Sequence, residues 1–266
     1  MPDNQASRLA LPSVTLCAVS SSNLAATVQA MEASLERIDF AKALLFTHFE
    51  REDFRPQPDP RIEFVRINPI LSSKAYSRFI LDDLARHIET DHCLIAQWDG
   101  HVIDEKQWRD EFLEYDYIGA IWPQFDDGHN VGNGGFSLRS KLLMEACAGA
   151  EFQSHHPEDI AICRTNRAML EAKGFRFAPA KIADWFAAER AGNLENSFGY
   201  HGIFLMPRAL GNEAFWAVYE TLDDRSTLKH DFWPILAHVM RGKGGIWRGL
   251  RLLTDRIIGH SPKSIR

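Results

Sequence analysis

The sequence predicts an α/β protein in which helices flank a mostly parallel central sheet, with a helical extension at the C-terminal end. Two observations lead to this fold class. Short, continuous apolar runs alternate with amphipathic segments, and turn-forming residues separate them. Continuous apolar strands are typical of parallel sheets that helices cover on both faces. The 266 residues, 45% of them hydrophobic and 25% charged, suffice for one large globular unit or two small ones.

The first half of the chain is predicted to supply most of the sheet. A strand at residues 13–19 is followed by Ser and Asn at 20–23, which can cap a helix at 24–38. Three prolines, Pro56, Pro58 and Pro60, mark the loop between the next two strands. Apolar residues at helical spacing predict an amphipathic helix at 72–88. The further predicted strands lie at 43–47, 62–67, 93–97 and 117–121.

The second half is predicted to be mainly helical. A strand-like segment ends a glycine-rich run at 131–139, and a late strand is expected at 198–206. The predicted helices lie at 140–148, 157–173, 210–222, 232–240 and 246–258, and Gly174 ends the second of them. We therefore expect a disordered or loosely attached segment at 1–12, a main domain at 13–222 and a basic helical extension at 223–266.

Composition narrows the classes of function. Four cysteines lie far apart and form no CxxC pair, which argues against a zinc knuckle and suits a reducing compartment. Residues 1–12 are polar and no run of 18 apolar residues occurs, so we expect neither a signal peptide nor a transmembrane helix. Seven basic side chains and one acid give residues 241–266 a charge of +6, so the rest carries −12 of the total of −6. This acidic body argues against nucleic acid as a partner, and we expect a cytoplasmic protein.

The most informative motif is the sequence VGNGGFSLR at 131–139, which has three glycines within four residues. Glycine readily takes a positive φ and lets the backbone approach a ligand closely. We therefore expect Asn133, Gly134 and Gly135 to lay main-chain amides against a polar ligand. An ordinary turn is the alternative.

Asp99 comes directly after an apolar strand and before Gly100. Because ligands bind beyond the carboxyl ends of the strands in such sheets, this carboxylate could hold a divalent cation on the diphosphate of a nucleotide. His201 is a candidate second ligand, since imidazole commonly binds transition metals such as manganese. An Asp-Gly turn and a structural histidine are the alternatives.

Two predicted helix starts carry further candidate groups. Glu158 and Asp159 follow Pro157, and one of them could be a general base that deprotonates a sugar hydroxyl. Their alternative role is to favour the dipole of the helix that begins there. Lys74 and Tyr76 begin the helix at 72–88 and suit a phosphate group, with a solvated helix face as the alternative.

Five motifs, in this order, resemble the GT-A glycosyltransferases. They are QWDG at 97–100, YDYIGA at 115–120 with Trp122 and Pro123, VGNGGFSLR at 131–139, PED at 157–159 and FGYHG at 198–202. More closely, they resemble a bacterial and fungal family known mainly as an uncharacterised, glycosyltransferase-like domain. The resemblance covers about residues 14–206, and its most specific part is the run 116–139.

The resemblance implies roles for single residues. Asp99 stands where GT-A enzymes carry the last Asp of their DXD motif, and Gln97 replaces the first. Glu158 and Asp159 resemble the acidic pair that contains the base of inverting members, and His201 resembles the late histidine of the metal site. Other positions would face the donor nucleotide (Ser20, Ser21, Asn23) or line the donor-sugar and acceptor pocket (Trp122, Asn133, Gly134, Gly135).

The expected activity is transfer of a sugar from a nucleotide diphosphate sugar to a hydroxyl of a glycan or glycolipid. We expect inversion, with Asp159 preferred over Glu158 as the base and Mn²⁺ or Mg²⁺ on the departing diphosphate. Two alternatives stay open. One is a metal-dependent hydrolase of nucleotide sugars or phosphoesters that activates water with Asp99 and His201. The other is a non-catalytic glycan- or nucleotide-binding module, which Gln97 in place of an Asp would suit.

The basic tail carries its own prediction. Ile246, Leu250, Leu253 and Ile257 recur at helical spacing and form one apolar stripe, with arginines beside and opposite it. This is the pattern of a helix that lies on an anionic membrane, where a peripheral enzyme at the inner face could meet a lipid-linked acceptor. The alternative is a terminal helix that docks its stripe on the domain or on a second subunit.

Overall fold

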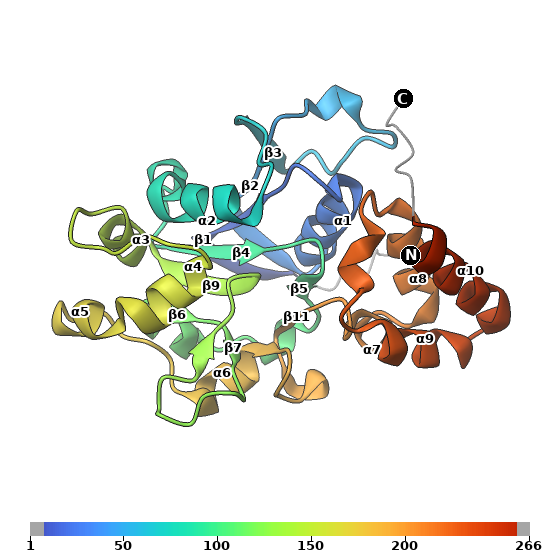
Figure 1. Cartoon of the computed structure of the whole chain (residues 1–266). Helices are drawn as coiled ribbons and strands as arrows, with labels where there is room; N and C mark the ends of the chain where they lie inside the picture. The colour runs from blue at the N-terminus through green and yellow to red at the C-terminus, as the bar shows by residue number, and fades with distance from the viewer. Residues whose placement is uncertain (1–7, 260–266) are drawn as a thin grey trace, which may run out of the picture.

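A six-stranded sheet forms the centre of the computed structural model, which describes residues 8–259 (Figure 1). Its strand order is β3-β2-β1-β4-β9-β6. The first four of these strands run parallel, whereas β9 is antiparallel to both of its neighbours. The strands are β1 (Leu9–Val19), β2 (Ile38–Thr47), β3 (Ile62–Arg66), β4 (His92–Ala96), β6 (Tyr117–Ile118) and β9 (Phe136–Ser140).

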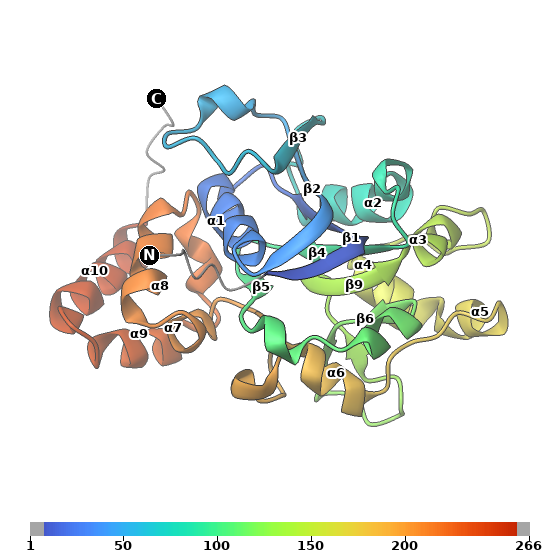
Figure 2. The ribbon, with the colours of Figure 1, turned by 180° about the vertical axis from the view of Figure 1, so that it is seen from behind.

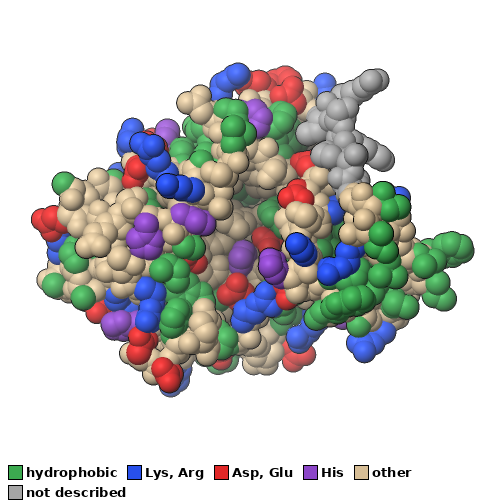
Figure 3. Space-filling view, in the orientation of Figure 1, with side chains coloured by type: hydrophobic (Ala, Val, Ile, Leu, Met, Phe, Trp, Pro, Cys, Tyr) green, Lys and Arg blue, Asp and Glu red, His purple; other side chains and the backbone are tan. Residues whose placement is uncertain are grey.

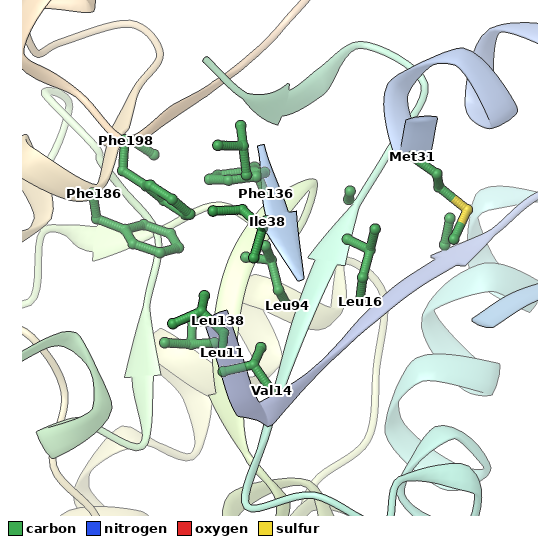
Figure 4. Close-up of a cluster of buried hydrophobic side chains, with 14 of the residues drawn as sticks. Leu11, Val14, Leu16, Met31, Ile38, Leu94, Phe136, Leu138, Phe186 and Phe198 are labelled. Atoms are coloured by element: carbon green, nitrogen blue, oxygen red, sulfur yellow. The ribbon is translucent and has the colours of Figure 1, made fainter. Parts of the chain in front are cut away.

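Helices cover both faces of this sheet (Figure 2). Alternate strand residues face opposite sides: Leu16 and Leu94 pack toward α1 (Leu24–Leu35), whereas Cys17 and Ile95 pack toward α2 (Ser73–Asp82) and α3 (Lys141–Cys147). Figure 4 shows the cluster on the α1 side, which Phe186 of α6 (Ala180–Phe186) joins. The predicted α/β fold, with a mostly parallel sheet between helices, is confirmed.

Two small sheets extend the structure beyond the central one. The strands β10 (Ala187–Ala188), β11 (Gly199–His201) and β5 (Gly100–Val102) form one sheet, in which β11 is antiparallel to β5. The strands β7 (Ala120–Ile121) and β8 (Val131–Gly132) form the other. Short 3₁₀ helices lie at Arg51–Asp53, Leu84–His87, Glu105–Gln107, Asp110–Glu114, Leu194–Asn196 and Arg225–Leu228.

The described part of the chain closes with four helices that share a second core. They are α7 (Met206–Ala209), α8 (Asn212–Thr221), α9 (Phe232–Met240) and α10 (Gly245–Ile258). Their buried residues form one cluster that also takes in Ala26 of α1 and Tyr200 of β11, so these helices pack onto the α/β part (Figure 1). No helix among residues 8–259 combines the length and apolar character needed to span a bilayer.

Several element boundaries differ from the sequence prediction. β1 begins at Leu9 rather than at residue 13, because Leu9 and Leu11 pair with β2 ahead of an irregularity in the register, where Pro12 is tolerated. Residues 1–7 lie outside the described residues. The strand expected at 117–121 divides at Gly119, where an added Cβ would lie 1.8 Å from the carbonyl oxygen of Gly132.

The helix and strand expected at 157–173 and 198–206 are also shorter than predicted. The helix is broken into α4 (Glu158–Ile160), a π-helical turn (Ala161–Thr165) and α5 (Arg167–Ala172). Asn166 interrupts it, because its side-chain amide donates to the carbonyl of Ala161 and so competes with the helical hydrogen bond. Only Gly199–His201 of the late strand is extended.

Candidate active site

A cavity of about 450 Å³ opens beyond the carboxyl ends of β1 and β4. Ser20, Ser21 and Gln97 line it from the two strand ends, and Tyr76 lines it from α2. The Oγ of Ser21 accepts a hydrogen bond from the main-chain amide of Ile70 at 2.8 Å. This bond joins the segment after β1 to the segment before α2, and both segments line the cavity. The hydroxyl of Tyr76 is buried and has no hydrogen-bond partner within residues 8–259. The structure thus brings four of the predicted donor-binding residues to one cavity.

Asn23 and Lys74 lie elsewhere, which corrects two of the predicted positions. Asn23 is buried at the start of α1, and its side-chain oxygen accepts hydrogen bonds from the amides of Asp223 and Asp224 at 2.9 and 3.0 Å. It therefore fastens α1 to the C-terminal helices instead of facing a nucleotide. Lys74 is exposed on α2 and does not line the cavity.

Asp99 and His201 lie side by side, together with Glu189, and we call these three residues the Asp99 cluster. The turn after β4 carries Asp99, and the pairing of β5 with β11 places His201 opposite Gly100. The Nε2 of His201 is 3.4 Å from Oδ1 of Asp99, and its Nδ1 is 3.3 Å from Oε1 of Glu189. Although burial disfavours the charged imidazole, these two carboxylates raise the pKa of His201 to about 10.

The glycine pair Gly134 and Gly135 separates the Asp99 cluster from a second polar cluster. An added Cβ on Gly135 would lie 2.0 Å from Nε2 of His201, and one on Gly134 would lie 1.9 Å from Oε1 of Glu158. Glycine is therefore needed here because side chains on both sides approach the backbone. The predicted positive φ is wrong for these glycines: within the loop only Asn133 has one, at 72°.

The main-chain amides of the glycine pair were predicted to face a polar ligand, but side chains of the protein accept their hydrogen bonds. The amide of Gly134 donates to Oδ2 of Asp159 at 3.2 Å, and the amide of Gly135 donates to Oδ1 of Asn133 at 2.8 Å. Asn133 is itself buried, and its carbonyl accepts a hydrogen bond from the hydroxyl of Tyr117 at 3.0 Å. The loop thus orients side chains, and its two glycine amides do not point toward open solvent or a ligand.

The second cluster consists of Arg139, Glu158, Asp159 and Ser77, and we call it the Arg139 cluster. Arg139 is fully buried in β9, and its Nη2 lies 3.5 Å from Oε1 of Glu158, which is 7% exposed. Ser77 on α2 donates to Oε2 of Glu158 at 3.1 Å. The two terminal nitrogens of Arg139 have no hydrogen-bond partner among the described residues. Glu158 is therefore the counter-ion of a buried guanidinium.

Asp159 occupies a different environment from its neighbour. It is half-buried, and its Oδ1 accepts a hydrogen bond from the amide of Ile160 at 2.8 Å. Burial raises its pKa above the usual range, and the carboxylate of Glu158 adds to the effect. A carboxylate with a raised pKa that remains accessible is a better proton acceptor than one held in a buried ion pair.

Trp122 is placed in the core, which differs from its predicted position in a sugar pocket. It is 6% exposed, and an added Cβ on Gly132 would lie 2.1 Å from its ring. The ring packs edge-on against Phe125 with a centroid separation of 5.6 Å. Trp122 therefore supports the glycine-rich segment by packing against its backbone.

Three cluster members, Glu189, Arg139 and Ser77, are not among the predicted site residues. Glu189 lies in a segment whose sequence carries no motif, and it reaches His201 only because β10 pairs with β11. Arg139 was part of a quoted motif but had no assigned role. An arginine inside a predicted strand could have indicated its role, because a buried guanidinium needs an acidic partner.

The Asp99 cluster brings two carboxylates and one imidazole together, which are residue types that bind divalent cations in proteins. Oδ1 of Asp99 and Nε2 of His201 are buried and face each other at 3.4 Å, and neither forms a hydrogen bond of good geometry within residues 8–259. Glu189 contacts the other ring nitrogen, as carboxylates do when they orient a metal-binding histidine. No group of three or more His, Cys, Asp or Glu among the described residues could hold a metal alone. Phosphate oxygens commonly complete such a site for Mg²⁺.

Comparisons with known proteins give a family and distant likenesses to solved structures. No curated protein matches the chain. The mannosyltransferase PcManGT from Pyrobaculum calidifontis, solved in complex with GDP-Man and Mn²⁺, shares 11% sequence identity and a TM-score of 0.44 over 97% of this chain and 77% of its own. That likeness is too weak to support an argument about activity. A family model described as "Protein of unknown function (DUF5672)" matches residues 60–201, more than half of the sequence, and the chain belongs to this family.

Proposed function

We propose that this protein is a metal-assisted glycosyltransferase that moves a sugar from a nucleotide diphosphate sugar to a hydroxyl of a glycan or glycolipid. The observation that carries the proposal is the arrangement around the glycine pair. The paired side chains of Asp99 and His201 lie on one side, and the half-buried carboxylate of Asp159 lies on the other. Gln97, two residues before Asp99, lines the cavity at the strand ends.

In the proposed reaction, the cavity binds the nucleotide of the donor. Ser20, Ser21 and Gln97 offer polar groups to it, and the partnerless hydroxyl of Tyr76 is available to the phosphates. A Mn²⁺ or Mg²⁺ ion held by Asp99 and His201 would act as a Lewis acid on the leaving diphosphate. Glu189 keeps Nε2 of His201 directed toward Asp99 by holding the opposite ring nitrogen.

Asp159 acts as the general base in this proposal. Its carboxylate takes the proton of the acceptor hydroxyl while the acceptor oxygen forms a bond to the anomeric carbon. The bond between that carbon and the diphosphate oxygen breaks, and the nucleoside diphosphate leaves with the electron pair. One displacement of this kind inverts the anomeric centre. Main-chain amides bind both oxygens of Asp159, so occupied oxygens do not separate the two acids. Glu158 is less suited to the role because it is buried as the counter-ion of Arg139, whereas Asp159 is half-buried.

The test is product analysis with a panel of nucleotide sugars in Mn²⁺, with and without acceptor alcohols. We expect a glycosylated acceptor and a nucleoside diphosphate in equal amounts, and slow hydrolysis alone when the acceptor is omitted. Release of free sugar at the same rate with and without acceptors would identify a hydrolase instead. Saturable nucleotide binding without turnover of any donor would identify a binding module.

A further inference from the structure

The C-terminal helices expose an unusual amount of apolar surface. Of the large hydrophobic side chains exposed within residues 8–259, only Leu71 and Leu142 lie outside α9 and α10. Figure 3 shows the resulting apolar patch over these helices, on the right of the view. Trp247 and Ile257 are 78% and 80% exposed. We call this set the α9–α10 patch, and its members are Trp233, Met240, Ile246, Trp247, Leu250, Ile257 and Ile258.

The patch exists because α10 packs against the C-terminal core through one face, whereas most of its apolar stripe lies on another face. Gly245, Gly249 and Leu252 are the buried residues of α10. An added Cβ on Gly249 would lie 2.9 Å from Cγ of Met240, and one on Gly245 would lie 2.3 Å from the carbonyl oxygen of Met240. The glycines thus let α10 approach α9 closely, and Ile246, Leu250 and Ile257 are left facing outward. Leu253, the remaining member of the predicted stripe, packs partly against the C-terminal core. The alternative in which the stripe docks on the domain therefore holds for Leu253 alone and is wrong for the other three residues.

The position of α10 is fixed by polar contacts, so its outward face is a defined surface. Asp255 accepts a hydrogen bond from the hydroxyl of Tyr219 at 2.6 Å and forms an ion pair with Arg225 at 2.5 Å. Arg248 forms an ion pair with Glu213 of α8 at 2.6 Å. These contacts hold both ends of the helix against the rest of the C-terminal core.

The charges around the patch favour an anionic partner. Residues 232–258 contain five basic side chains and a single acid, Asp255. Arg241 and Lys243 are exposed and form no ion pair within the described residues. In a symmetric dimer through this patch the same cations would face each other, which costs energy. Tryptophans beside an apolar, basic helix face are typical of proteins that lie at the lipid headgroup boundary.

We propose that the α9–α10 patch binds the surface of an anionic lipid bilayer, with its apolar side chains inserted at the headgroup boundary and Arg241 and Lys243 among the anionic headgroups. Figure 3 shows a hollow near the middle of the same face as the patch. A bilayer at the patch would therefore present membrane-borne acceptors on the side where the molecule is open. The binding itself does not depend on the proposed transfer reaction.

The test is co-sedimentation of the full-length protein with vesicles of phosphatidylcholine alone or with 30–40% phosphatidylglycerol, roughly the anionic content that gives a strong surface potential. We expect binding to the anionic vesicles, a blue shift of tryptophan emission, and weakening in high salt. The Trp247→Ser, Ile246→Ser double variant should bind at least tenfold more weakly. Removing both free cations in Arg241→Gln, Lys243→Gln should cost about fivefold for each charge.

Leu142→Ser is the matched control, because Leu142 is 66% exposed on α3, outside the patch. It should bind vesicles as the wild type does, and all variants should keep the wild-type circular dichroism spectrum, since the changed side chains are exposed. Equal loss of binding in the control would overturn the proposal. So would the absence of vesicle binding together with a concentration-dependent dimer in sedimentation velocity, which the patch variant abolishes. That result would assign the patch to a second copy of the chain.

Discussion

The Asp99 cluster and the Arg139 cluster meet at the same two glycines but have different internal chemistry. In the Arg139 cluster, a guanidinium and Glu158 are almost fully buried against each other. In the Asp99 cluster, two carboxylates flank one imidazole, and all three side chains are 13–17% exposed. Buried paired charges suit a structural role, whereas partly exposed acids and an imidazole can bind a cation once the imidazole gives up its proton. From this difference we propose a structural role for Arg139 and Glu158 and a metal-binding role for Asp99 and His201. Asp159 is the more exposed acid of the Arg139 cluster, and we propose that it acts in catalysis.

The largest expected effect is that of Asp159→Asn on the rate of sugar transfer. The amide keeps the size of the side chain but cannot accept the acceptor's proton, so kcat should fall about 10²–10⁴-fold. Donor binding should remain. Because the pKa of Asp159 is raised, wild-type activity should fall with decreasing pH at a higher pH than an ordinary aspartate would give. A variant with the wild-type rate and pH profile would remove Asp159 from catalysis.

The same variant has a distinct signature in stability. A raised pKa means that the folded state binds the proton of Asp159 more tightly than the unfolded state does. The ionised carboxylate therefore costs stability at neutral pH, and this cost disappears as the pH falls through the raised pKa. Asp159→Asn also loses one of the two hydrogen bonds that the carboxylate accepts from main-chain amides, so the expected signature lies in the pH dependence. The stability of the variant relative to the wild type should be most favourable at neutral pH and should fall in acid, as thermal unfolding across pH would show.

The opposite pattern is expected for Glu158→Gln. Loss of the carboxylate leaves the guanidinium of Arg139 buried without a counter-ion, which typically costs about 3–5 kcal/mol of unfolding free energy. Urea unfolding measures this loss. The double variant Arg139→Met, Glu158→Gln removes both charges and should recover part of the stability. If Glu158→Gln is as stable as the wild type but loses transfer activity, the roles of the two acids must be exchanged.

A smaller effect is expected for Glu189→Gln, which changes the partner of His201 without removing a proposed ligand. Loss of such an orienting carboxylate typically weakens metal binding by about 10–100-fold. The expected result is a higher Mn²⁺ concentration for half-maximal nucleotide binding, with saturating metal restoring it. Glu195→Gln, at an exposed position of a 3₁₀ helix, is the control. An unchanged Mn²⁺ requirement would show that Glu189 does not orient the imidazole.

The sequence predicted those parts of the site that depend on local order along the chain. Ser20, Ser21 and Gln97 follow strands of a parallel sheet, so the fold class alone predicts that they gather at one edge, where they line one cavity. The fold itself was predictable for the same reason, since continuous apolar runs between amphipathic helices mark its strands. Glu189 meets His201 only because two distant strands pair, and the local sequence around Glu189 does not predict that pairing.

Where the local prediction was incorrect, a distant contact decided the outcome. Asn23 resembles a helix cap that faces a ligand, but the C-terminal segment at Asp223 and Asp224 takes its side-chain oxygen. The glycine pair resembles an amide nest, but the buried side chains Glu158 and His201 occupy the space beside it. The apolar stripe of α10 resembles a docking face, but close packing through Gly249 leaves it outside.

The most direct test of the Asp99 cluster is thermal unfolding of the wild type and Asp99→Asn with GDP or UDP, in Mn²⁺ and in chelator. A ligand at about 100 times its Kd stabilises a protein by about 2.7 kcal/mol, which raises the Tm of a chain of this size by roughly 5–10 °C. We expect such a rise for the wild type with one of the nucleotides, only in Mn²⁺, and its loss in Asp99→Asn. An equal rise in chelator, or in the variant, would contradict it.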